Sequence, residues 1–307
     1  MKTYNTADWY TIFRIDKADT LKKLYKLIII VCLYTWLISY LELEYFGLSR
    51  NSKVNNLTIM HTLLSFAISM LLVFRTNTAY DRWWEGRKLW GTLVTSSRSI
   101  AIKVNAMLDP ADTDSRRFFR KSIAMYASVL AHHLASEQTR LALDENNHPE
   151  LSHLDKNKHV PNQVAGFLIG KIYELHREGK IKGEQLIILN HEMEALTSVC
   201  GACERIKNTP IPFSYSTFLK RFIFVYVMTL PFSLVFLLGY LAIPVVALVF
   251  YVLAALELIA EEIEEPFGGD SNDLPTQKMA DNIRKHVTEI LEVNREQMTT
   301  EQSTIVS

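Results

Sequence analysis

Residues 222–260 read FIFVYVMTLPFSLVFLLGYLAIPVVALVFYVLAALELIA, and Glu257 is the only charged residue among them. As a single helix this block would be about 58 Å long, roughly twice the hydrocarbon thickness of a bilayer. It is therefore predicted to form two membrane spans, and Gly239 and Pro244 mark the turn between them. Glu257 either lies inside the second of these spans or marks the point where the helix has entered water.

Two further apolar blocks precede this one, at residues 27–41 and 57–74. A membrane-spanning helix needs about 20 mostly apolar residues, so each block with its flanking residues is long enough for one span. His61 interrupts the second block. A polar side chain at this depth either faces a pore or pairs with a neighbouring helix, and pairing is the preferred interpretation. The sequence thus predicts a membrane protein with four spans.

The distribution of Lys and Arg predicts how the chain is oriented. Residues 1–26 carry six of them and residues 75–88 carry four, whereas residues 42–56, between the first two spans, carry two. Because Lys and Arg favour the cytosolic side, both termini are expected in the cytosol. The predicted parts are a cytosolic N-terminal segment (1–26), the first two spans (27–74), a cytosolic helical region (75–221), the third and fourth spans (222–260), a cytosolic C-terminal helical segment (261–296) and a tail expected to be disordered (297–307).

The region between the second and third spans has the pattern of helices. Asp112 or Thr113 caps a helix whose apolar residues recur at helical spacing. Further helices are predicted at residues 162–178 and 184–207, after a long polar loop at 138–160. No stretch shows the alternation typical of a strand, so the predicted fold class is all-α.

The composition argues against two classes of function. The chain has 33 basic and 33 acidic residues, whereas a nucleic-acid-binding protein usually carries a basic excess. It contains no HExxH, P-loop, GxSxG or dinucleotide-binding motif, so neither an enzyme nor a cofactor is predicted. Cys200 and Cys203 form a single CxxC pair, which suits a redox site or half of a zinc site, but packed helical thiols are the preferred interpretation.

The histidines offer no metal site at the level of sequence. His132 and His133 are adjacent, so their side chains point about 100° apart on a helix and are poorly placed to share an ion. His148, His153 and His159 lie in the polar loop and are expected to be solvated.

Three short stretches stand out from ordinary helical sequence. They combine charged residues with tryptophan, proline or glycine beside the predicted spans. In the stretch at 75–87, the mixture of charge and tryptophan either anchors aromatic rings at the membrane interface or forms a buried knot of ion pairs that fixes helix geometry. The stretches are RTNTAYDRWWEGR at 75–87, with Asp81, Arg82, Trp83 and Trp84; CERIKNTPIPF at 203–213, with Glu204 and Arg205; and EEPFG at 264–268, with Pro266, Phe267 and Gly268.

In their order and in their spacing to the spans, these stretches resemble the bestrophin family, including its many bacterial members, over residues 10–290. The resemblance implies a homopentameric ion channel around one central pore, in the inner membrane of a bacterium. Its implied partners are further copies of the chain, the lipid bilayer and the permeant ions. In that family the second span lines a narrow apolar neck, and a second constriction, the aperture, lies at the cytosolic end of the pore.

Counting back from the tryptophan motif, which is the stretch at 75–87, the resemblance puts the neck at Phe66, Met70 and Phe74. These residues are four apart, so they share one face of a helix. In a pentamer they would form stacked apolar rings, which gate by dewetting. Any membrane helix offers apolar residues at this spacing, so the assignment depends on the resemblance.

The aperture corresponds to Glu184, with Leu186 and Ile187 as neighbouring candidates. A ring of Glu184 carboxylates would attract cations, whereas a ring of apolar side chains would act as a steric filter. A glutamate solvated at the protein surface is the simpler alternative. Sodium and potassium are the predicted permeant ions. A chloride or other anion channel of the same fold, and a membrane-anchored scaffold or signalling protein, are the alternatives.

Animal bestrophins carry a run of acidic residues after Pro-Phe-Gly, which forms a calcium-binding clasp. Only Asp270 and Asp273 stand at the corresponding positions here. Calcium takes roughly six to eight oxygen ligands, so this residual site is weak. Calcium is therefore not expected to be required for channel opening.

Overall fold

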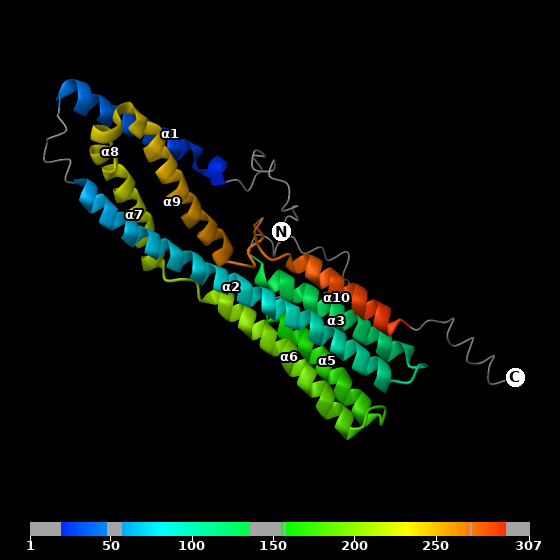
Figure 1. The fold of residues 1–307 in the computed structure, drawn as a ribbon. Coiled ribbons are helices and arrows are strands. Elements are labelled where there is room, and N and C mark those ends of the chain that lie inside the picture. Colours follow the sequence, from blue (N-terminus) through cyan, green and yellow to red (C-terminus); the bar gives the residue numbers. More distant parts are fainter. Residues whose placement is uncertain (1–19, 48–56, 136–154, 156–157, 271, 293–307) are drawn as a thin grey trace. The chain divides into compact units, whose positions relative to one another are not determined.

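A computed structural model describes residues 20–47, 57–135, 155, 158–270 and 272–292 of the chain. All regular secondary structure in these ranges is helical, which confirms the predicted fold class (Figure 1). The α-helices are α1 (Thr20–Tyr40), α2 (Leu57–Met107), α3 (Thr113–Leu134), α5 (Val160–Arg177), α6 (Gly183–Asn208), α7 (Phe213–Thr229), α8 (Pro231–Leu238), α9 (Ala242–Glu264) and α10 (Thr276–Leu291). The π-helical turn η2 (Leu41–Tyr45) extends α1, and the 3-10 turn η6 (Gly239–Leu241) precedes α9.

The described residues form two compact units, and the boundary between them falls inside α2, between Trp84 and Glu85. The first unit contains the chain up to Trp84, Thr209–Pro266 and Asp270–Asp273. The second unit contains Glu85–Asn208, Phe267–Gly269 and the chain from Leu274 onward. Helices α1, α7, α8 and α9 therefore belong to the first unit, and α3, α5, α6 and α10 belong to the second.

Among the described residues, three stretches of helix are long and apolar enough to cross a membrane: Thr20–Tyr45, Thr58–Met107 and Phe213–Glu264. The third stretch reverses direction between α8 and α9, where the chain forms η6, so that α7 and α8 form one arm and α9 forms the other (Figure 1). Gly239 has a φ of +54°, which residues with a side chain rarely adopt. The predicted turn at Gly239 is confirmed, whereas Pro244 lies in the first turn of α9, where proline is tolerated.

The first unit is built around an apolar core between its helices. Helices α1 and α7 both pack against α9. The Tyr215 hydroxyl at the start of α7 donates to the Leu71 carbonyl oxygen of α2 at 3.0 Å. The buried core consists of Val31, Ile68, Leu72, Leu219, Ile223, Tyr226, Val227, Leu230 and Val246. Many other large apolar side chains of these helices are exposed, as expected of a surface that meets lipid.

His61 is buried on the side of α2 that faces this core. Its Nε2 lies 3.0 Å from Thr229 Oγ1 at the end of α7, and its ring meets the Tyr226 ring edge-on. A hydrogen bond between helices satisfies a polar ring inside an apolar segment. The interpretation that His61 pairs with a neighbouring helix is therefore confirmed.

The second unit is a helical bundle that includes the second half of α2. Helix α3 packs against both α10 and α5, and α5 packs against α6. Helix α3 begins as predicted, because Asp112 Oδ1 accepts a hydrogen bond from the backbone N of Ser115 at 3.1 Å. The helices predicted at 162–178 and 184–207 correspond to α5 and α6, with ends that differ by no more than two residues.

Gly86, in the stretch at 75–87, makes room for Phe267 in the second unit. A Cβ atom added to Gly86 would lie 3.1 Å from the ring of Phe267, which is closer than such contacts normally come. Phe267 is 4% exposed, its neighbour Pro266 is also buried, and Gly268 is partly buried. The first and third conspicuous stretches thus touch within this bundle.

Candidate functional site

The predicted neck residues lie on a side of α2 that the other described residues leave exposed. Phe66, Met70 and Phe74 are 70, 44 and 58% exposed. Ile68 and Leu72, on the opposite side of the helix, are 1 and 3% exposed. Helix α2 therefore has one apolar face that packs into the core of the first unit and another that is exposed on the surface of that unit. Within a membrane the outer face meets either lipid or another protein chain.

The candidates for the aperture lie at the beginning of α6. Glu184 belongs to the first turn of this helix and is exposed. Ile187 is 72% exposed, and Leu186 is partly buried. A carboxylate in the first turn of a helix interacts favourably with the helix dipole, so Glu184 also has a local structural reason to occupy this position.

A buried arginine joins α2 to α9. Arg75 is 1% exposed, and its Nη2 lies 2.7 Å from Glu264 Oε2. Its Nε lies 3.6 Å from Glu257 Oε2. Glu257 is 3% exposed, so the alternative that this residue has entered water is wrong. Because a buried charge is tolerated only when it is paired, Arg75 and the two glutamates depend on one another.

The three conspicuous sequence stretches also meet beside this ion cluster. Arg82 donates from Nε to the Glu264 carbonyl oxygen at 3.1 Å and from Nη1 to the Thr209 carbonyl oxygen at 2.5 Å. Trp83 Nε1 donates to the Asn272 carbonyl oxygen at 3.1 Å. The interpretation of the stretch at 75–87 as a buried ion-pair knot is confirmed by Arg75 and its two glutamates, whereas the hydrogen bonds of Arg82 and Trp83 lie at partly buried or exposed positions.

The remaining motif residues lie nearer to the surface. Trp84 is 43% exposed and stacks on Tyr80, with ring centroids 6.5 Å apart. Asp81 is exposed. Arg205 on α6 pairs with Glu85 on α2 at 2.5 Å, and both side chains are largely exposed. These residues add contacts around the motif without entering its buried part.

The two residual calcium positions differ in their burial. Asp270 is exposed, whereas Asp273 is 3% exposed. Asp273 Oδ2 accepts a hydrogen bond from the backbone N of Asp270 at 2.5 Å, so this carboxylate closes a turn of the chain. Among the described residues, the one group of three or more His, Cys, Asp or Glu side chains near enough to share a metal ion lies in the second unit.

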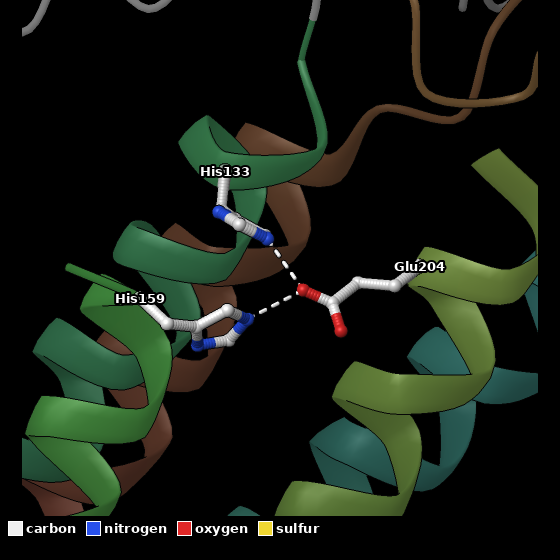
Figure 2. Close-up of side chains that lie close together, drawn as sticks. All are labelled: His133, His159 and Glu204. Carbon is white, nitrogen blue, oxygen red and sulfur yellow. Dashed lines mark hydrogen bonds and ion pairs between the residues drawn. The ribbon is translucent and has the colours of Figure 1, made fainter. Parts of the chain in front are cut away.

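That group consists of His133, His159 and Glu204 (Figure 2). The Nε2 atoms of both histidines lie 2.5 Å from the same oxygen, Glu204 Oε1. His133 lies in the last turn of α3, His159 caps the start of α5, and Glu204 belongs to α6. The prediction that His159 is a solvated loop residue is wrong, because it is bonded to Glu204. His148 and His153 lie outside the described residues.

The surroundings of this group determine its protonation. Burial raises the pKa of Glu204, but the hydrogen bonds from His159 and His133 outweigh burial and hold that pKa below its usual value. Burial raises the pKa of Cys200 and of Cys203, on the same helix, to about 12. Both thiols are therefore protonated and buried, which confirms the interpretation of the CxxC pair as packed thiols.

The chain matches a family model and is similar in sequence to proteins from several bacteria. A family model described as Bacterial/Fungal Bestrophin protein matches residues 1–289. The voltage-dependent anion channel-forming protein of Nostoc sp. (strain PCC 7120) is 29% identical over 92% of this chain and 91% of that protein. The voltage-dependent anion channel-forming protein YneE of Escherichia coli (strain K12) is 33% identical over 76% of each chain.

Solved structures share the fold as well. A mutant form of a bacterial bestrophin homologue from Klebsiella pneumoniae has a TM-score of 0.74 and 28% identity, covering 87% of this chain and 98% of that chain. A second mutant form from the same organism has a TM-score of 0.74 and 27% identity, covering 88% of this chain and 100% of that chain. The similarity thus extends far beyond the three short stretches.

Replacing Arg75 by methionine is expected to destabilise the protein strongly. The change leaves Glu257 and Glu264 buried without their partner, which costs about 3–5 kcal/mol. Lys220→Met is the matched control, because Lys220 pairs with Glu261 at 2.8 Å on the surface, where such pairs contribute about 0–1 kcal/mol. Denaturant unfolding of the protein in detergent measures both effects. Equal losses in the two variants would contradict a special role for the Arg75 cluster.

Proposed function

Because this chain belongs to the bestrophin family of membrane ion channels, we propose that it forms a homopentamer with a single central pore lined by α2. The observation that carries the proposal is the uncovered apolar face of α2, with Phe66, Met70 and Phe74. This face lies in a segment long and apolar enough to cross a membrane. A membrane-anchored scaffold, the alternative, needs only a single span, and in it this face would meet lipid.

In the proposed pore, the neck consists of three stacked rings of identical side chains. Phe66, Met70 and Phe74 are spaced by four residues, so consecutive rings lie about 6 Å apart along the helix. Apolar rings of this kind hold water weakly, so a narrow neck empties and stops conduction, and a wider one fills and conducts. Such rings control whether ions pass without selecting the sign of their charge.

We propose further that the second unit and both termini lie in the cytosol, with the spans in the inner membrane of a bacterium. Support comes from the Lys and Arg residues, which are concentrated in residues 1–26 and 75–88 and sparse in residues 42–56. In this orientation, the exposed start of α6 belongs to the cytosolic part of the channel.

The proposed permeant ions are sodium and potassium, selected at an aperture near Glu184. An exposed carboxylate repeated around a symmetric pore attracts cations and repels anions. Conduction of anions is the second candidate, and a specific observation favours it. The relatives of Nostoc and Escherichia coli both carry the name of voltage-dependent anion channel-forming proteins.

The ionic selectivity is tested by reversal potentials of the purified protein in a planar bilayer under a NaCl gradient. Cation conduction gives a reversal near the sodium equilibrium potential, and anion conduction gives one near the chloride potential. Glu184→Gln is expected to move the reversal toward zero, because it removes the charge and keeps the size of the side chain. Glu194→Gln, an exposed glutamate on the same helix, is the control and is expected to have no effect.

Two results would contradict this proposal. A wild-type reversal near the chloride potential would establish the second candidate and remove the role given to Glu184. A protein that remains a monomer or dimer in mild detergent, by light scattering, would contradict the pentamer and favour the scaffold alternative.

Shortening the neck side chains is expected to ease opening of the pore. Phe66→Ala and Phe74→Ala widen the apolar rings, so the neck holds water more readily and the open probability rises several-fold. Leu248→Ala is the control, because Leu248 is an apolar residue of α9 that is 61% exposed. Single-channel recordings compare the three variants with the wild type. Equal currents in all of them would exclude this face of α2 from the pore.

We also propose that calcium is not required for opening. Asp273 is engaged with the backbone of Asp270, and calcium sites draw on roughly six to eight oxygen ligands. Channel currents are expected to be unchanged when calcium is removed with a chelator. Asp270→Asn is likewise expected to leave the channel currents unchanged. Steep activation of the wild type in a calcium titration, lost in Asp270→Asn, would refute the proposal.

A further inference from the structure

The group of His133, His159 and Glu204 has no part in the proposed pore, yet it brings three metal-ligating side chains together. Their candidate ligand atoms all lie within 4.8 Å of one another. Figure 2 shows both imidazole rings directed at the Glu204 carboxylate. The histidines are 71 and 45 positions away from Glu204 in the sequence, so the fold itself creates this convergence.

The donor set suits a late first-row transition ion, Zn²⁺ above all. Two imidazole nitrogens and one carboxylate oxygen are a ligand combination that zinc binds tetrahedrally, with the fourth position left for water. Calcium and magnesium are poor candidates, because both prefer oxygen ligands. Cys200 and Cys203 are buried and are not among the side chains whose ligand atoms converge here.

The distances admit an ion with movement of side chains alone. A tetrahedral zinc ion holds N and O ligands at about 2.0–2.2 Å, so neighbouring ligand atoms are about 3.3 Å apart. Each Nε2 atom lies 2.5 Å from Glu204 Oε1, so each pair of atoms must separate by about 0.8 Å to admit the ion. The two imidazole rings are already neighbours, with centroids 4.7 Å apart.

The backbone around the group is held in position by other contacts. Lys207 lies one turn after Glu204 on α6, and its Nζ donates to the carbonyl oxygens of His133 and Ala135 at 3.2 and 3.3 Å. The end of α3 is therefore fixed against α6 independently of the imidazoles. The three side chains remain 21–33% exposed, so an ion reaches them from solvent.

The cap of α5 indicates where the protons lie before an ion binds. His159 Nδ1 accepts the backbone N–H of Asn162 at 3.2 Å, so the proton of the neutral ring is on Nε2 and is donated to Glu204. An ion at Nε2 displaces that proton. The ring then carries its proton on Nδ1 and no longer caps α5. Ion binding is thus expected to loosen the first turn of α5 while tying His159 to α6.

We propose that His133, His159 and Glu204 form a zinc site that joins α3, α5 and α6 within the second unit. The ion replaces the two short hydrogen bonds on Glu204 by three metal–ligand bonds, with one position open to water. Because the ion binds the folded arrangement of three separate segments, it stabilises this unit against unfolding. The site does not depend on the pore, so it can be tested whether or not the protein conducts.

The test uses the full-length protein in detergent, without an affinity tag, after removal of metals with EDTA and dialysis. Calorimetric titration with ZnCl₂ and elemental analysis are expected to give one zinc per chain, and zinc is expected to raise the melting temperature. Co²⁺ in place of zinc is expected to give the visible absorption of a tetrahedral site. Exchange of the Asn162 amide hydrogen is expected to become faster when zinc is bound.

Two variants separate metal binding from folding. His159→Asn removes a ligand but keeps a side chain that caps helices well, and Glu204→Gln keeps the shape of the carboxylate. Both are expected to fold, by circular dichroism, and to bind zinc at least about tenfold more weakly. His191→Asn, which changes an exposed histidine of α6, is the control and is expected to bind like the wild type.

Two outcomes would overturn the proposal. Equal zinc affinity in the wild type and in folded His159→Asn would mean that zinc binds elsewhere on the surface. Absence of zinc binding by the folded wild type would mean that the three residues serve only as a hydrogen-bonded contact between helices.

Discussion

The buried charge of Arg75 is the constraint on which the first unit depends. An arginine removed from water costs several kcal/mol unless opposite charges accompany it, and here Glu257 and Glu264 of α9 supply them. Glu264 makes two further contacts. Its Oε1 accepts a hydrogen bond from the backbone N–H of Ile211 at 2.7 Å, and its carbonyl oxygen accepts one from Arg82. One carboxylate residue therefore ties α2, α9 and the segment leading into α7 to a single arrangement.

This constraint also decides which side of α2 is left uncovered. Leu72 and Ile68 lie about one and two turns before Arg75 on the same side of the helix, and all three are buried. Phe66 and Phe74 consequently point outward. A rotation of α2 that covered these phenylalanines would carry Arg75 away from its glutamates and leave charges unpaired inside an apolar segment. The ion cluster and the uncovered apolar face are thus two results of one helix orientation.

The second unit uses polar contacts differently. Its buried Arg116 donates to the backbone carbonyl oxygens of Asn105 and Leu108, and exposed ion pairs such as Arg205 with Glu85 contribute little. In the group around Glu204, two histidines from separate segments meet one carboxylate oxygen of α6. His159 serves both this group and the cap of α5, so a change at its ring affects a helix end and an interhelical contact together.

The features that the sequence by itself determined are those encoded in neighbouring residues. Apolar blocks of sufficient length predict membrane helices. Gly239 predicts the reversal because glycine tolerates a positive φ, and Asp112 predicts the start of α3 because its side chain caps a free N–H. The three conspicuous stretches predicted the family because their residue order is rare. Each of these signals is local, so it can be recognised without knowing the rest of the fold.

The tertiary structure alone decided which distant residues meet. It buried Glu257 beside Arg75, joined His61 to Thr229, and brought His159 to Glu204. Charge and histidine patterns in the sequence are compatible with solvated side chains at each of these positions, because no local spacing encodes a partner many turns away. These side chains pair because the packed helices bring them together and exclude the water that would otherwise form hydrogen bonds with them.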